Sequence, residues 1–183
     1  MGSEMCIRDR TSTDEIWGSD EAAPYLRSVP CKFDEEEPWS SWIVELPWKM
    51  LEDRIREKGE GTVLRSVTVT RRSESGAATA LEAVSDKDSC IIENEYEIRK
   101  FLAPVNCMIT EKDGTETAGG SLLPSAYFEL ERTQNGNLQV RGKGYGHGVG
   151  MSQTGADKMA EQGYDYREIL DYFFRNITVE NLG

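Results

Sequence analysis

Residues 142–155, GKGYGHGVGMSQTG, hold the chain's single histidine in a run where every second residue is glycine. In an extended chain, side chains alternate between faces, so one face would be bare and Lys143, Tyr145 and His147 would share the other. A bare face permits close approach of a ligand or of another strand, and glycine also permits backbone angles closed to other residues. The run alone leaves two interpretations open: a substrate-contacting histidine, or a glycine bend around a core histidine.

Other chemical motifs are absent from this stretch and from the rest of the sequence. The glycine spacing fits neither nucleotide-binding fingerprint, GxGxxG or GxxxxGK[ST]. Residues 150–154, GMSQT, lack the second glycine of a GxSxG nucleophile elbow. The cysteines form no CxxC pair, and one histidine cannot complete a usual Cys/His zinc set. We therefore expect no cofactor.

The elements that must position the run are short strands followed by two helices. The sequence predicts strands in 41–46, 62–76, 78–86, 89–94, 107–114, 125–133 and 137–146, and helices in 47–59 and in 95–103, the second ending before Pro104. A helix over 152–163 should turn Ala156, Met159 and Ala160 inward. A second begins at Asp165 with a capping box. The fold class is α+β, mostly antiparallel β with short helices and a C-terminal helical pair.

Composition excludes several classes of protein and of partner. The 183 residues suit one domain, and a net charge of −12 disfavours nucleic acid. No stretch is apolar enough for a membrane span. We expect 1–10 to be a non-native or artefactual leader and 11–183 to form the domain. Cys31, Cys90 and Cys107 are expected as buried free thiols, although a Cys90–Cys107 disulfide stays open.

Four tryptophans fall in the first third of the sequence, at Trp17, Trp39, Trp42 and Trp48. Tryptophan buries a large area and most often anchors cores and loops. We interpret these four as such anchors, with the alternative that one or two line a sugar-binding cleft.

The segment GYGHGVGMSQTGADKMAEQGYDYREILDYFF, residues 144–174, closely resembles the C-terminal signature of the SpoIID/LytB family, the stage II sporulation protein D domain. Residues 14–42 also look like that family's middle segment. The resemblance spans roughly 11–182, with 60–135 matching only in general character. Its sporulation members are lytic transglycosylases that cleave peptidoglycan glycan strands lacking stem peptides during forespore engulfment, and LytB-type members are described as amidase enhancers.

The family's catalytic glutamate lies in an N-terminal helical segment that has no counterpart in this sequence, and the family's His-Ser-x-Ser-Gly-Gly stretch is also missing. We therefore interpret the chain as an N-terminally truncated domain whose catalytic acid is unknown and whose status as an enzyme is open. Some members bind zinc through Cys and His; we expect no metal here. The alternative function is a non-catalytic peptidoglycan-binding or amidase-enhancer module.

The resemblance carries over a cleft wall for substrate binding. His147 would contact substrate or orient the missing acid, Tyr145 would stack on a sugar, and Ser152 and Gln153 would hydrogen-bond its polar groups. The close approach would be permitted by Gly146, Gly148 and Gly150. Implied partners are peptidoglycan glycan strands, a cell-wall amidase and other engulfment proteins. The implied location is the cell envelope outside the cytoplasmic membrane, reached through a missing N-terminal segment.

Overall fold

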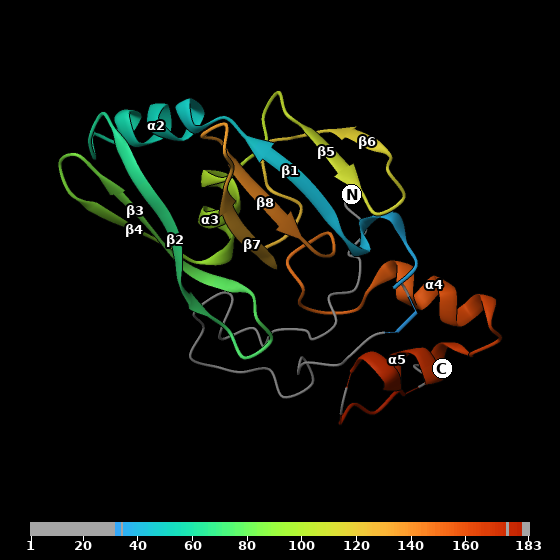
Figure 1. Ribbon diagram of the computed structural model, residues 1–183. Coiled ribbons are helices and arrows are strands. Elements are labelled where there is room, and N and C mark those ends of the chain that lie inside the picture. The colour runs from blue at the N-terminus through green and yellow to red at the C-terminus, as the bar shows by residue number, and fades with distance from the viewer. Residues whose placement is uncertain (1–31, 34, 175, 181–183) are drawn as a thin grey trace.

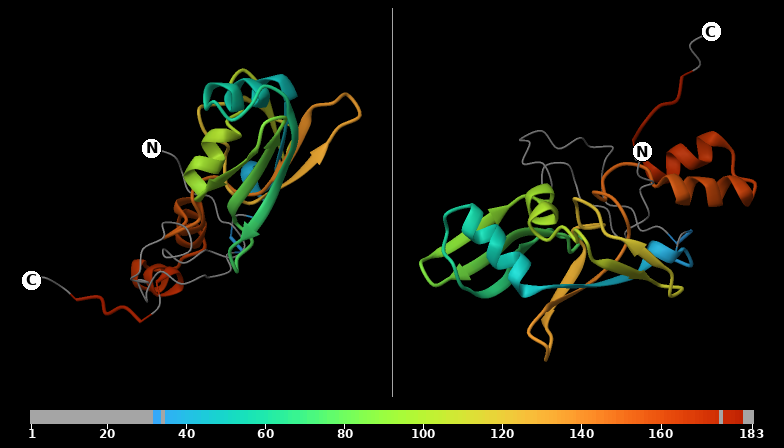
Figure 2. Two further views of the ribbon diagram at one scale, coloured as in Figure 1. Left: turned by 90° about the vertical axis from the view of Figure 1, so that its left-hand side faces the viewer. Right: turned by 90° about the horizontal axis from the view of Figure 1, so that it is seen from above.

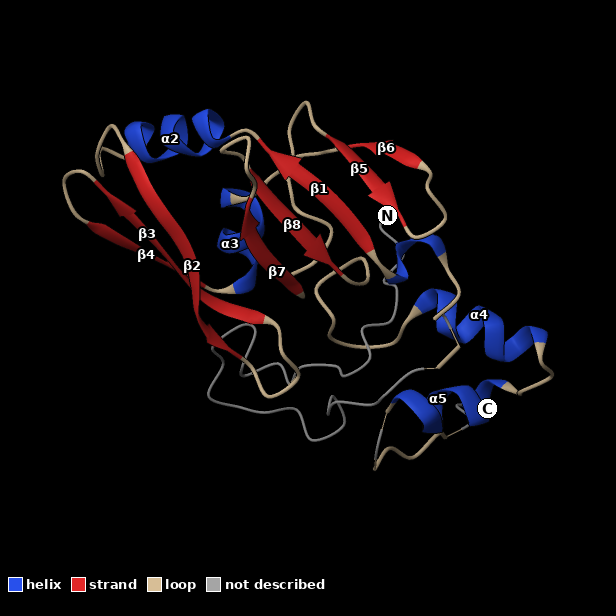
Figure 3. Ribbon diagram, viewed as in Figure 1, coloured by secondary structure: helices blue, strands red, loops and turns tan. Residues whose placement is uncertain are grey.

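The computed structural model describes residues 32–33, 35–174 and 176–180. The leader over 1–10, Trp17 and Cys31 lie outside the described residues, so the predictions for them stay predictions. Among the described residues, strands form two antiparallel sheets and the last helices form a pair (Figures 1 and 3). The predicted α+β class is confirmed.

The larger sheet has five strands in the order β6-β5-β1-β8-β7. These strands are β1 (Trp42–Leu46), β5 (Met108–Glu111), β6 (Glu116–Ala118), β7 (Phe128–Arg132) and β8 (Leu138–Gly142). Trp42, Val44 and Leu46 of the central strand are buried, while Ile43 and Glu45 between them are exposed. One face of the sheet therefore covers the core, and the other is open.

The smaller sheet has the order β2-β3-β4. Its strands are β2 (Leu64–Arg72), β3 (Ala78–Ser85) and β4 (Ser89–Glu93). The predicted hairpin of β2 and β3 is confirmed by their antiparallel pairing. Between this sheet and the buried face of the larger one lies a single main core, which includes Leu51, Leu81 and Ile98.

Two helices complete this core, α2 (Trp48–Glu57) and α3 (Glu95–Phe101). In α2, Leu51 and Ile55 share the buried face because they are four residues apart. The N-cap of α3 is Asn94, whose side chain accepts a hydrogen bond from the N–H of Glu97 at 2.9 Å. The helix thereby begins beside the site described below.

The C-terminal pair consists of α4 (Gln153–Glu161) and α5 (Tyr166–Phe173). Figure 1 and the view from above in Figure 2 show it at the opposite end from the three-stranded sheet. Met159, Ile169 and Phe173 form an apolar cluster separate from the main core. The predicted capping box at Asp165 is confirmed.

One expectation for α4 is wrong: Ala160 is exposed. Gly155 and Met159 are buried and Ala156 is half-buried, so the inward face follows these three positions. Ala160 follows Met159 directly and is rotated about 100° around the helix axis away from that face.

Cys90 and Cys107 are free, half-buried thiols, so the open Cys90–Cys107 disulfide is not formed. Burial raises the pKa of both thiols. Within the described part of the chain, no helix combines the length and apolar character needed to cross a bilayer.

Candidate functional site: a tethered glycine loop

Residues 143–151, here called the glycine loop, connect β8 to α4 and do not continue the strand. Gly144, Gly146, Gly148 and Gly150 have φ values of 69°, 117°, 76° and 93°. These angles are readily adopted only by glycine. The expectation of an extended run with side chains alternating between faces is therefore wrong beyond Gly142, because every second residue turns the chain instead. The alternative use of glycine, for unusual backbone angles, is confirmed.

The loop begins against Trp42 of β1. A Cβ on Gly142 would lie 2.0 Å from the Trp42 ring, so this glycine is required for close approach. The Trp42 indole Nε1 donates a hydrogen bond to the carbonyl of Gly144 at 2.8 Å, and the Gly144 N–H donates to the Trp39 carbonyl at 2.8 Å. The first turn of the loop is thus fixed by two residues distant in sequence.

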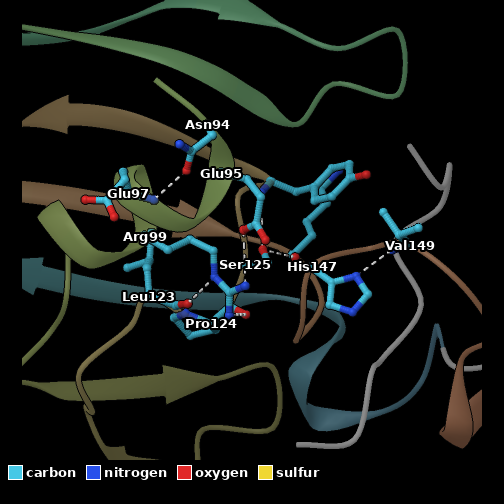
Figure 4. Close-up of polar contacts among 11 residues, drawn as sticks. Asn94, Glu95, Glu97, Arg99, Leu123, Pro124, Ser125, His147 and Val149 are labelled. Atoms are coloured by element: carbon cyan, nitrogen blue, oxygen red, sulfur yellow. Dashed lines mark hydrogen bonds and ion pairs between the residues drawn. The ribbon is translucent and has the colours of Figure 1, made fainter. Parts of the chain in front are cut away.

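A buried polar network holds the next turn (Figure 4). Glu95 and Arg99 of α3 form an ion pair at 3.1 Å, and only 4% and 9% of their surfaces are exposed. Arg99 also donates hydrogen bonds to the carbonyls of Leu123 and Pro124, at 2.8 and 3.2 Å. The Pro124 carbonyl in turn accepts a hydrogen bond from the N–H of Gly146 at 2.8 Å. Gly146, which precedes His147, is therefore linked to Arg99 of α3 by two hydrogen bonds that share the Pro124 carbonyl.

His147 itself is half-buried (Figure 4). Its Nδ1 accepts a hydrogen bond from the N–H of Val149 at 3.0 Å. In the neutral ring the proton then sits on Nε2, which makes that nitrogen a hydrogen-bond donor. Val149 is buried in a small apolar cluster with Ala126 and Tyr127. Polar contacts before His147 and apolar packing after it orient the imidazole.

The other predicted site residues differ in how exposed they are and in what they contact. Tyr145 is half-buried, with its ring edge-to-face against Trp39 at 5.0 Å between centroids. Ser152 is 1% exposed, and its Oγ accepts a hydrogen bond from the N–H of Gly155 at 3.0 Å as the N-cap of α4. Gln153 is exposed at the first turn of that helix. Tyr145 and His147 of the loop and Gln153 of α4 are therefore at least partly exposed, whereas Ser152 is buried and caps α4.

The tryptophans of the described residues act mainly as anchors, as expected. Trp42 is buried, and Trp48 donates its indole N–H to the Leu64 carbonyl at 3.0 Å while the Arg132 guanidinium lies 3.2 Å from its ring centroid. Trp39 supports Tyr145, which keeps it near the site. None of the sequence patterns pointed to Arg99 or Ser125. Arg99 reaches the loop through the Pro124 carbonyl and Ser125 bonds the Lys143 carbonyl, and both links join segments far apart in sequence.

The described residues contain no group of three or more His, Cys, Asp or Glu side chains that could hold a metal ion. The glycine loop carries a histidine and a tyrosine, and α4 adds the amide of Gln153 directly after it. Such a set can bind a ligand rich in hydroxyl and amide groups by hydrogen bonds and by stacking.

The fold and the loop define an α+β domain with a glycine-histidine loop that leads into a C-terminal helical pair. Its residues 27–150 match the model of a family described as Domain of unknown function (DUF8618), and the chain belongs to that family. The chain is also related to curated proteins with more informative names, which confirms the resemblance to the SpoIID/LytB family.

Three relatives show the extent of this similarity. Stage II sporulation protein D of Bacillus amyloliquefaciens is 28% identical over 168 residues, covering 92% of this chain and 41% of the relative. An uncharacterized protein of Brachyspira hyodysenteriae is 28% identical over 97% of this chain and 42% of its own length. The amidase enhancer of Bacillus subtilis is 38% identical over 61 residues, which cover 33% of this chain and 8% of the relative's length. The chain spans about two fifths of the first two relatives.

Proposed function

We propose that this chain binds peptidoglycan glycan strands lacking stem peptides and takes part in their processing, with the glycine loop as one wall of the binding cleft. The observation that carries the proposal is the orientation of His147 by Gly146 on one side and Val149 on the other. A loop held this firmly is suited to reading a repeating polar polymer without reorganising. Relatives named stage II sporulation protein D and amidase enhancer support a sporulation-related role at the cell wall.

The reaction class that fits is lytic transglycosylation. A carboxylic acid protonates the glycosidic oxygen, which leaves as the glycosidic bond breaks, and the sugar's own 6-hydroxyl bonds to the anomeric carbon while giving its proton to the resulting carboxylate, so that a 1,6-anhydro end forms. We assign no residue as that acid. The buried Glu95 is engaged by Arg99 in support of the loop, so we give it a structural role. His147, Tyr145 and Gln153 would bind and orient the sugar.

A second candidate is a non-catalytic module that holds glycan strands for a cell-wall amidase. The name of the amidase enhancer relative favours it, since that similarity extends over 61 residues at 38% identity. Both candidates place the protein in the cell envelope, outside the cytoplasmic membrane.

The test is incubation of the chain with stem-peptide-free glycan strands, measuring strand retention by sedimentation and the ends of the products by mass spectrometry. We expect retention that falls at least tenfold in His147→Ala and Tyr145→Ala, about the loss of one good hydrogen bond or stacking contact. Tyr166→Ala is the matched control, because Tyr166 is 56% exposed on α5 and its hydroxyl accepts a hydrogen bond from its neighbour Arg167.

Anhydro ends would favour the enzyme, and retention without cleavage would favour the binding module. Wild-type protein that neither retains nor cleaves the strands would refute both.

A further inference from the structure

A groove of about 580 Å³ lies on the exposed face of the five-stranded sheet, where β8 ends. It is lined by the exposed side chain of Ile43 and part of Leu130, together with the polar residues Ser41, Arg141 and Lys143. Sugar rings have an apolar face and a rim of hydroxyl groups, so a groove with both apolar and polar lining is suitable for them.

Three of the charged side chains that line the groove form ion pairs among the described residues, and the fourth does not. Glu129 pairs with Arg72 at 3.0 Å, and Glu131 pairs with Arg141 at 3.3 Å. Lys143 is exposed, and its ammonium group has no ion-pair partner among residues 32–33, 35–174 and 176–180. In a chain of net charge −12, this groove presents one uncompensated positive charge.

The backbone of Lys143 is held in place by the fold. The Lys143 N–H donates to the Tyr127 carbonyl at 2.9 Å, and the Ser125 hydroxyl donates to the Lys143 carbonyl at 2.6 Å. Lys143 is also the first residue of the glycine loop. A chain-like ligand that occupies the groove would therefore reach the start of that loop.

We propose that this groove is a second glycan subsite in which Lys143 pairs with a free carboxylate on the strand. The inference rests on the proposed function and deepens it. In peptidoglycan, the stem peptide is joined by an amide bond to the lactyl carboxyl group of the muramyl sugar. Removal of the peptide exposes that carboxylate, so an unpaired cation distinguishes a bare strand from a peptide-substituted one by charge. Glu129 and Glu131, already paired, accept hydrogen bonds from sugar hydroxyls.

The test compares two forms of one ligand: stem-peptide-free strands with free carboxylates, and the same strands with their carboxylates converted to amides. Affinity is measured by calorimetry at low and at high salt, for wild type and for the variants Lys143→Gln and Lys143→Arg. Lys87→Gln is the matched control, because Lys87 is an exposed lysine that contacts the Gly59 carbonyl instead of the groove. Melting curves verify that each variant is folded.

We expect Lys143→Gln to weaken binding of the carboxylate strand about threefold to fivefold at low salt, the range of an exposed ion pair, and less at high salt. The amidated strand should bind wild type and Lys143→Gln alike, and Lys143→Arg and Lys87→Gln should bind like wild type. Equal affinities of wild type and Lys143→Gln for the carboxylate strand, or equal losses for both strands, would overturn the subsite. If His147→Ala still lost binding in that case, the proposed function would stand; if wild type bound neither strand, the proposed function itself would fail.

Discussion

The substitution Gly142→Ala tests how the sheet and the glycine loop are joined. The added Cβ would lie 2.0, 2.3 and 2.4 Å from three ring carbons of Trp42. The ring is 1% exposed and its indole N–H is held by the Gly144 carbonyl, so it cannot move aside without breaking that hydrogen bond. Overpacking costs about 1–3 kcal/mol, and a buried hydrogen bond adds about 0.5–1.5 kcal/mol. We expect the free energy of unfolding to fall by about 2–4 kcal/mol.

The assay is urea unfolding at neutral pH, followed by circular dichroism and by tryptophan fluorescence. The matched control is Gly120→Ala, because a Cβ at Gly120 meets nothing within 4 Å and its φ is compatible with alanine. It should leave stability unchanged or raise it by less than about 1 kcal/mol. Equal unfolding midpoints for wild type and Gly142→Ala would refute the reasoning that Trp42 and the loop are locked together.

Two further substitutions test local features. The pKa of Asp86 is lowered from 3.8 to about 2 by hydrogen bonds from the N–H groups of Val63 and Thr62 and from the Thr62 hydroxyl. Asp86 therefore contributes its full stabilisation above pH 3.8, and this stabilisation is lost as the pH falls through about 2. Asp86→Asn should therefore flatten the decline of the urea midpoint over that range, and an unchanged slope would contradict this. Ser152→Ala should lower the free energy of unfolding by about 1 kcal/mol through loss of the α4 N-cap, whereas Gln153→Ala should not. A Ser152→Ala variant that kept its stability but bound glycan more weakly would show that Ser152 contacts the ligand and does not act mainly as the N-cap.

The features that the sequence predicted well are local ones. The capping box at Asp165 needs only a carboxylate and a glutamate three residues later, and the structure has both hydrogen bonds. The strand at 41–46 is rich in the aromatic and β-branched residues that favour strands, and the structure buries Trp42, Val44 and Leu46 on one face. Such signals lie within one turn or one strand, so they can be recognised in the sequence without knowledge of the rest of the fold.

The features that the sequence could not predict depend on distant partners. Alternating glycine allowed an extended run as well as a series of left-handed turns, and the choice is made by Trp39, Trp42 and Pro124, which bind the backbone of the loop. The contribution of Arg99 depends on α3 packing beside the loop. The short strand β6 was not expected either, because three residues are too few to show a period.

The placement of β1 has a consequence for how the chain acquires its fold. This early strand lies at the middle of its sheet, between β5 and β8, although both partners come much later in the sequence. As the polypeptide leaves the ribosome, the backbone N–H and C=O groups of residues 42–46 have no strand partner on either side until β5 and β8 have been synthesised. Pairing between strands so far apart in sequence gives a high contact order, so we infer that the chain folds slowly and is prone to aggregation while it does so. Trp42, the first residue of β1, is then among the last side chains to be buried.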